Sequence, residues 1–248
     1  MKVRPITTPI IQAQAKLEQV LRSALPQLKE KTVVVLASKL VATCEGRFVA
    51  KKTGSRQEKF ELVKKEADLY LDPAQSQYDM MLTIKDNWMF VNAGIDESNA
   101  NNQYLLWPSQ PQRRAEEIWQ FLRWEYGLKE LGVIITDSRS IPLNWGVTAH
   151  AIAFCGFEPL KSYIDQPDLF GRKMKMEKLN IMQSLAAAAG AELGEGDEST
   201  PLALIEEISH IKFQNRAPSP AEKADLKISI QDDIYAPLLT GVNWKTDK

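Results

Sequence analysis

The sequence contains few of the residues on which several common kinds of site depend. Its 248 residues include only two cysteines, Cys44 and Cys155, and two histidines, His150 and His210. Two cysteines cannot form a disulfide framework, and these two lack the spacing of paired metal ligands. We therefore expect both to be small, buried residues in a reducing compartment. We expect His150 in the core or an interface, and we do not expect a histidine-based zinc site.

Strong charge and long apolar runs are also absent. The formal net charge is −1, so the chain lacks the basic balance that is typical of nucleic-acid-binding proteins. No run approaches the roughly 20 apolar residues that span a bilayer, and residues 1–5 lack the apolar core of a signal peptide. The sequence therefore predicts a cytoplasmic protein that binds neither nucleic acid nor membranes.

Three well-known site motifs are missing. The chain has no Gly-x-x-x-x-Gly-Lys-Ser/Thr and no Gly-x-Gly-x-x-Gly, which argues against P-loop and Rossmann nucleotide sites. It also lacks Gly-x-Ser-x-Gly, the nucleophile elbow of the α/β-hydrolases, so nothing supports a catalytic serine triad.

The remaining pattern is that of an ordinary globular protein, with 44% apolar and 25% charged residues. Apolar periodicity predicts helices and strands that alternate along the chain, which favours a mixed α/β (α+β) fold. We expect a single domain over 1–248, with a possible second lobe from about residue 103. The helices are expected over residues 12–25, 57–71, 112–126 and 178–193, and the strands over 32–37, 81–84, 88–91, 104–108, 132–138, 145–154 and 201–208.

Polar residues follow the apolar runs at three places: the loop 92–102, the strand end at Asp137 and Ser138, and the loop 194–200. Taken alone, the first loop is more typical of a surface turn than of a site. In open α/β sheets, however, ligands bind beyond the carboxyl ends of strands. Carboxylate, hydroxyl and amide oxygens suit magnesium or manganese, and glycine-bearing loops can hold phosphate through backbone N–H groups. The pattern allows either a phosphoryl-transfer enzyme or a metal-binding module without chemistry.

Several of these motifs match a known family. The segments 38–47 (Ser-Lys-Leu-Val-Ala-Thr-Cys-Glu-Gly-Arg), 93–99 (Ala-Gly-Ile-Asp-Glu-Ser-Asn), 135–138, 156–160 and 168–172 resemble the coenzyme F420:L-glutamate ligase (CofE-like) family. Within the family, the chain most resembles the folate γ-glutamate ligase branch, which also carries Leu-Trp-Pro, here 106–108, and a tail like 232–239.

The resemblance implies a CofE-like fold, neither P-loop nor Rossmann, and a nucleotide-dependent ligase. The enzyme would add L-glutamate to a folate (tetrahydrofolate) acceptor through an acyl phosphate. It would use ATP or GTP with Mg²⁺ or Mn²⁺, and would form a homodimer. Two alternatives stay open: ligation to coenzyme F420-0, and a nucleotide-binding homologue that has lost catalysis.

The resemblance also assigns residues to roles. It implies a divalent metal at Asp96 and Asp137, with a second served by Ser138 and Glu195. It implies nucleotide contacts by Ser38, Lys39, Asn99, Gly194, Gly196, Asp197, Glu198, Ser199 and Thr200. Arg47 and Arg172 are the candidates for gripping substrate carboxylates in the catalytic site, because guanidinium pairs with carboxylate bidentately. The equal alternative for each is a structural arginine paired with a loop acid.

Two positions depart from the family pattern. Asn144 stands where many members have an arginine, and an asparagine cannot supply the charge of a guanidinium. Arg139 would replace that charge if the intervening loop folds back. Thr43 stands where some deazaflavin ligases have a lysine. Both changes bear on acceptor and nucleotide choice, and neither removes a proposed metal ligand.

Overall fold

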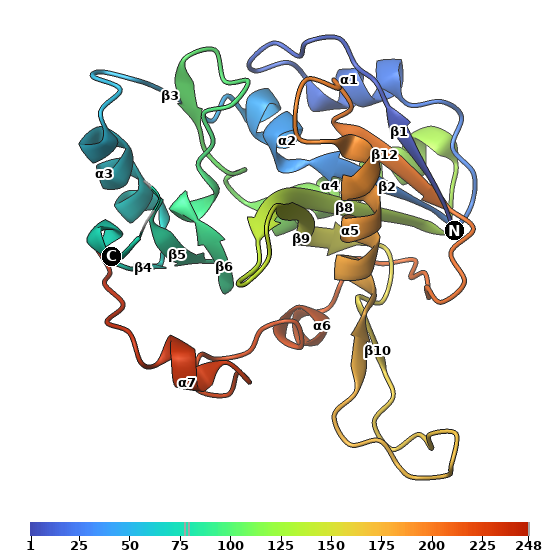
Figure 1. Cartoon of the computed structure of the whole chain (residues 1–248). Coiled ribbons are helices and arrows are strands. Elements are labelled where there is room, and N and C mark those ends of the chain that lie inside the picture. The colour runs from blue at the N-terminus through green and yellow to red at the C-terminus, as the bar shows by residue number, and fades with distance from the viewer. Residues whose placement is uncertain (77, 79, 248) are drawn as a thin grey trace.

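A five-stranded mixed sheet forms the centre of the protein (Figure 1). The computed structural model describes residues 1–76, 78 and 80–247. The strand order is β1 (Lys2–Ile6), β12 (Leu202–Glu206), β2 (Thr32–Ala37), β8 (Leu131–Ser140) and β9 (Val147–Cys155). Only β2 and β8 are parallel to each other; the other neighbours are antiparallel.

Helices cover both faces of this sheet, which explains the unbroken apolar run of β2. Val34 and Leu36 pack with α1 (Leu17–Ala24), α2 (Ser38–Glu45) and α4 (Pro111–Tyr126) on one face. Val33 and Val35 pack with α5 (Ile181–Leu193) on the other. A strand that is buried on both faces has no polar alternation, so the sequence pattern and the three-layer architecture agree.

The helix α5 lies unusually close to β9. A Cβ atom on Gly190 would lie 2.4 Å from the Cβ of Ala149, so only glycine fits at this point of the helix. Small side chains therefore let α5 approach the sheet, and this approach places its C-terminal end, followed by the loop 194–200, over the edge of β8.

A smaller unit packs beside the central sheet, at the left of Figure 1. It contains α3 (Arg56–Glu66) and the antiparallel strands β4 (Leu69–Tyr70), β5 (Leu82–Lys85) and β6 (Trp88–Val91). The short strands β3 (Phe48–Ala50) and β7 (Gln103–Leu105) pair with each other nearby. The 3-10 turns η1 (Pro73–Gln75) and η2 (Asn92–Gly94) complete it. This unit has an apolar cluster of its own, and its last strand leads directly into the loop 92–102.

Two peripheral segments complete the chain. The strands β10 (Leu160–Ser162) and β11 (Lys178–Asn180) form the base of an arm whose loop projects away from the body (Figure 1). The C-terminal tail carries α6 (Pro220–Ala224) and α7 (Ala236–Leu239), then returns to the smaller unit, where Lys245 pairs with Tyr70 of β4.

The mixed fold expected from the sequence is confirmed, with corrections at three helix ends. The helix expected over 12–25 begins only at Leu17. The helix expected over 57–71 ends at Glu66, because Leu69–Tyr70 pairs with β5. The helix expected over 178–193 begins at Ile181, because Lys178–Asn180 pairs with β10. In the last two cases strand pairing overrides helical periodicity. The division into domains remains a prediction.

The cysteine and histidine expectations agree with the structure in part. Cys155 and His150 are buried, whereas Cys44 is half-buried; both cysteines are free thiols. Within the described residues, no helix has the length and apolar character that a bilayer crossing requires.

Candidate active site

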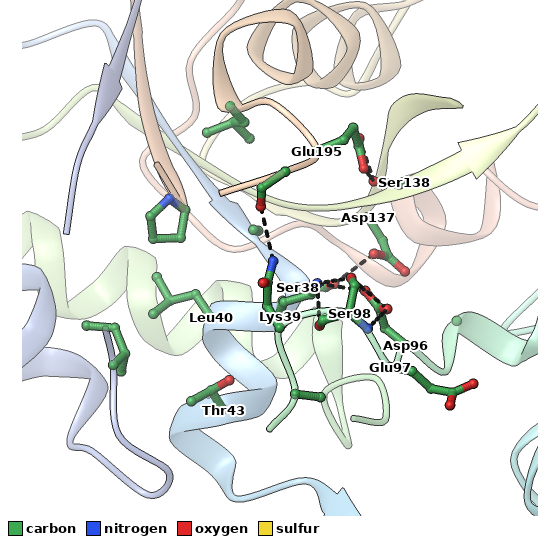
Figure 2. A pocket seen from close by; sticks show the side chains of 18 of the residues that line it. Ser38, Lys39, Leu40, Thr43, Asp96, Glu97, Ser98, Asp137, Ser138 and Glu195 are labelled. Carbon is green, nitrogen blue, oxygen red and sulfur yellow. Dashed lines mark hydrogen bonds and ion pairs between the residues drawn. The ribbon is translucent and has the colours of Figure 1, made fainter. Parts of the chain in front are cut away.

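A large cleft of about 1220 Å³ opens at the carboxyl ends of β2 and β8. The three polar segments that the sequence singles out, 92–102, Asp137–Ser138 and 194–200, all line it, and Figure 2 shows them converging. The N-terminal segment 8–14 and the start of α2 complete the wall. Stretches that lie about a hundred residues apart in sequence therefore share one cavity.

The parallel pairing of β2 with β8 brings Ser38 to Asp137. Ala37 and Thr136 are register partners, so the next residue of each strand emerges at the same edge of the sheet. The Ser38 hydroxyl donates a hydrogen bond to Asp137 Oδ1 at 3.0 Å. A strand end that looks like a simple turn in the sequence is therefore half of a polar pair.

The Asp137 carboxylate is held by neutral donors only. The Trp107 indole N–H donates to Oδ2, and Ser38 holds Oδ1. The pKa of the Asp137 carboxyl is raised to about 6. Burial is the main cause and the negative charge of Asp96 a smaller one, while the hydrogen bonds from Trp107, Ser38 and the Ser138 backbone act to lower it. Within the described residues, no lysine or arginine forms an ion pair with Asp137. A cation in the cleft would compensate this buried charge.

Asp96 has the opposite environment. Lys39 Nζ lies 2.7 Å from its Oδ2, and the Ser98 backbone N–H donates to its Oδ1 at 2.7 Å. Burial acts to raise the pKa of Asp96, but the hydrogen bond and charge of Lys39, together with the hydrogen bonds from Ser98, outweigh it, so the net pKa is lowered. Asp96 is therefore ionised over the physiological range, and Lys39 is the group that a ligand would displace from it.

The loop 194–200 forms hydrogen bonds with both of the other polar segments. The Ser138 hydroxyl lies 2.7 and 2.8 Å from the two carboxylate oxygens of Glu195. The side-chain amide of Asn99 donates to the Gly196 carbonyl at 3.0 Å. The Gly196 N–H in turn donates to the Glu198 carboxylate at 2.8 Å. This loop already holds an anionic oxygen on its backbone, which is the interaction that a phosphate would make.

All the residues expected to bind nucleotide or metal line the cleft, from Ser38 and Lys39 to Thr200. The two candidate catalytic arginines do not. Arg47 Nε donates to the Trp107 carbonyl at 2.9 Å, and its guanidinium pairs with Glu66 at 3.2 Å. Arg172 is exposed on the projecting arm. Their catalytic roles remain predictions, and neither side chain reaches the cleft within this chain.

The positions that depart from the family pattern lie apart from one another. Asn144 is exposed in the turn between β8 and β9, where its amide donates to the Pro142 carbonyl. Arg139 is half-buried and lies 3.3 Å from His150 Nδ1. Thr43 lines the cleft. The turn does not place Asn144 against the cleft wall.

The donor set in the cleft fits a hard divalent cation by its chemistry. Asp96, Asp137 and Glu195 supply carboxylates and Ser138 a hydroxyl, and oxygen ligands are those that magnesium and manganese prefer. Over residues 1–76, 78 and 80–247, no three Asp, Glu, His or Cys side chains form a ready-made ligand group. The carboxylates instead occupy separate contacts with Lys39, Ser38 and Ser138.

Sequence reasoning missed two contributors to the site. Trp107 was notable only as part of the Leu-Trp-Pro segment, yet it donates to Asp137. The segment 8–14 contributes Thr8, Gln12 and Gln14 to the cleft wall. The sequence shows only that Trp107 directly precedes a proline at the end of an expected strand. This pattern does not indicate that its partner is Asp137, 30 residues away.

Comparison with known proteins gives the cleft a context. The model of the family described as F420-0:gamma-glutamyl ligase matches residues 5–207. Coenzyme F420:L-glutamate ligase of Methanosarcina barkeri is 31% identical, over 72% of this chain and 74% of the relative. The enzymes of the same name from Methanopyrus kandleri and Methanocaldococcus jannaschii are 30% and 28% identical, each over 72% of this chain and 76% of the relative.

These relatives are named for coenzyme F420 and for L-glutamate, and none of the three is named for folate. The resemblance to the ligase family is therefore confirmed, and so is the expectation of an amide-forming ligase. The comparisons do not support the expected folate acceptor. They favour the alternative acceptor, coenzyme F420-0.

Proposed function

The chain belongs to the F420-0:gamma-glutamyl ligase family, and we propose from this that it joins L-glutamate to F420-0 in a nucleotide-dependent reaction. One observation carries the proposal beyond family membership. Two polar loops and the polar end of β8, from distant parts of the chain, converge on a single cleft that is large enough for more than one small substrate.

The proposed reaction has two balanced steps. The terminal phosphoryl group of ATP or GTP passes to a carboxylate oxygen of the acceptor, and the nucleoside diphosphate leaves. The amine of L-glutamate then attacks the acyl carbon, the C–N bond forms, and inorganic phosphate leaves with the former carboxylate oxygen. The amine loses its proton to solvent or to a carboxylate of the cleft. Positioning and charge compensation account for most of the acceleration in phosphoryl transfer.

The chain's own residues would orient the nucleotide. Lys39 carries a positive charge at the start of α2 and already contacts Ser98, on the wall of the cleft. Asn99 and the loop 194–200 supply an amide and backbone N–H groups. These donors suit phosphate oxygens, and we assign the nucleotide to this side of the cleft.

Asp96, Asp137, Ser138 and Glu195 would hold divalent metal beside these donors, because Asp96 lies 2.7 Å from Lys39 and Glu195 belongs to the loop 194–200. When bound, the metal supplies screening of the charge that develops on the attacking and leaving oxygens. Asp137 fits this role because, among the residues that the structure describes, its half-buried carboxylate has only neutral hydrogen-bond partners. We also propose that the enzyme acts in the cytoplasm. We further propose that it forms a homodimer, which light scattering on the purified protein tests.

The decisive experiment is a ligation assay by mass spectrometry. The purified protein is incubated with F420-0, L-glutamate, Mn²⁺ or Mg²⁺, and either ATP or GTP. A product that is one glutamyl residue heavier, released with one equivalent of phosphate, is the expected result. Hydroxylamine should trap an acyl phosphate when glutamate is left out. Absence of product with both nucleotides and both metals overturns the proposal.

A folate acceptor is the second candidate. The specific observation in its favour is that the folate-branch segment 232–239 lies in the tail beyond residue 207, where the family match ends. A parallel reaction with tetrahydrofolate separates the two acceptors. Tight, metal-dependent nucleotide binding without turnover of either acceptor would indicate a homologue that has lost catalysis.

A further inference from the structure

Trp107 occupies a pocket that is shaped for its indole ring. The side chain is 1% exposed, and Phe90 packs edge-on against it with ring centroids 4.8 Å apart. Gly94, at φ +73°, lies directly beneath it: a Cβ there would lie 1.8 Å from the indole nitrogen. The third residue of the loop 92–102 is therefore a glycine, which leaves room for this ring.

A polar network holds the main chain of Trp107. Arg47 Nε donates to the Trp107 carbonyl at 2.9 Å. The Arg47 guanidinium pairs with Glu66 at 3.2 Å, and Lys85 pairs with the same carboxylate at 2.7 Å. The Lys85 ammonium also lies 5.6 Å from the centroid of the indole. Both the ring and the backbone of Trp107 are thus fixed from the side away from the cleft.

The indole N–H is the link between this network and the cleft. It donates to Asp137 Oδ2, while Ser38 donates to Oδ1 from the start of α2. Because the two donors come from different elements, the carboxylate cannot rotate without losing one of them. Both donors are neutral, so the negative charge of Asp137 remains available to a ligand.

We propose that Trp107 is the positioning residue of Asp137 and that its indole N–H sets the affinity of the cleft for a divalent cation. The inference rests on the proposed function insofar as that function assigns a cation to Asp137. Outer residues that orient a metal-binding side chain typically change metal affinity by about 10- to 100-fold when they are removed. Phenylalanine at this position would fill most of the pocket but could not donate.

The chain offers a matched control. Trp119 is also buried, its indole N–H donates to the Leu131 carbonyl at 2.8 Å, and a glycine, Gly156, lies against its ring. Trp119→Phe removes the same kind of hydrogen bond far from any proposed ligand. Trp107→Phe and Trp119→Phe should therefore lose stability to a similar extent and differ only in cation binding.

The test measures free Mn²⁺ by electron paramagnetic resonance during titration of each protein, without nucleotide or acceptor. We expect the Kd for Mn²⁺ to rise about 10- to 100-fold in Trp107→Phe and to change less than about twofold in Trp119→Phe. Equal affinity in Trp107→Phe and wild type, equal losses in both variants, or no Mn²⁺ binding by the wild type would each overturn the proposal.

A second measurement does not need Trp107→Phe, in case that variant does not fold. In ¹⁵N-tryptophan-labelled protein, Mg²⁺ should shift one buried indole N–H resonance, and Trp119→Phe identifies the resonance of Trp119. The proposal is contradicted if Mg²⁺ shifts only the indole N–H resonance of Trp119, or if it shifts no indole N–H resonance. Failure to ligate F420-0 would leave these results unchanged, so the two proposals fail separately.

Discussion

The side-chain amide of Asn99 donates to the backbone carbonyl of Gly196 at 3.0 Å and so joins two loops that lie 97 residues apart. Asn99 has φ +53°, a conformation that asparagine tolerates better than most residues. Asn101 and Asn102 share it, with φ +47° and +60°. Three asparagines of the loop 92–102 therefore occupy positions where the backbone has a positive φ. Of these three, Asn99 also forms a hydrogen bond between loops.

We predict that Asn99→Gly weakens nucleotide binding by about tenfold, because one hydrogen bond of about 1–1.5 kcal/mol between the loops is lost. Glycine accepts the positive φ, so the change removes the side chain without backbone strain. Asn102→Gly is the matched control, since it has the same backbone conformation and lies outside the cleft wall. Calorimetry with each nucleotide measures both. Equal affinities of the two variants would show that the bond is not part of the site.

Replacing the buried acid should separate activity from stability. We predict that Asp137→Asn lowers the ligation rate by at least about 100-fold, equivalent to about 3 kcal/mol of transition-state stabilisation. The midpoint of thermal unfolding at pH 8 should stay the same or rise, because burial disfavours the charged carboxylate.

Asp96→Asn should also abolish ligation, while the loss of its half-exposed pair with Lys39 costs at most about 1 kcal/mol of folding free energy. Wild-type turnover in either variant would show that these residues do not serve the reaction.

The two arginines should behave differently. Arg47→Ala leaves the Trp107 carbonyl without its donor and removes one of the two cations on Glu66. We predict that it lowers the free energy of unfolding by about 2 kcal/mol. Arg172→Ala should change that free energy by less than about 0.5 kcal/mol, because the side chain is exposed on the arm. Urea unfolding measures both.

The proposed catalytic role of Arg172 has its own test. If the arm grips a substrate carboxylate, Arg172→Ala should raise the KM for glutamate or the acceptor by at least about tenfold without changing stability. Unaltered kinetics in that variant would leave the arm as a purely structural feature of the chain.

His150 gives the protein a predictable dependence on pH. Its pKa is lowered to about 3, mainly by burial and to a smaller extent by the charge of Arg139. The unfolded chain takes up a proton near pH 6.5 whereas the folded protein does not, so the stability present above pH 6.5 is lost as the pH falls. The loss should be about 1.4 kcal/mol per pH unit between pH 6.5 and 3.

Denaturant unfolding at pH 7 and pH 5 tests this prediction. Wild type should lose about 2 kcal/mol more over that interval than His150→Phe, which cannot bind the proton. Parallel pH profiles for the two proteins would contradict it. Phenylalanine is the suitable replacement because His150 already packs edge-on against Trp88, with ring centroids 4.6 Å apart.

Much of the fold follows from local patterns in the sequence. The run 32–37 is β-branched and apolar throughout, and it forms a strand that is buried on both faces. The turn at Asp86 and Asn87 joins β5 and β6 with positive φ at both residues, as a two-residue hairpin requires. The helix ends at Glu66 and Ile181 were not predictable locally, because the adjacent residues leave the helix to pair with distant strands.

By itself, the sequence determined the family, the mixed fold and the polar residues of the cleft. These follow from motifs and periodicities that each occupy about ten neighbouring positions, where residue type alone carries the information. Only the tertiary structure decided what each side chain touches. It showed that Trp107 donates a hydrogen bond to Asp137 and that Lys39 pairs with Asp96. It also showed that Arg47 contacts the Trp107 carbonyl instead of lining the cleft. The physical reason is that hydrogen bonds and ion pairs depend on distances of about 3 Å between atoms, and chain topology sets such distances for residues far apart in sequence.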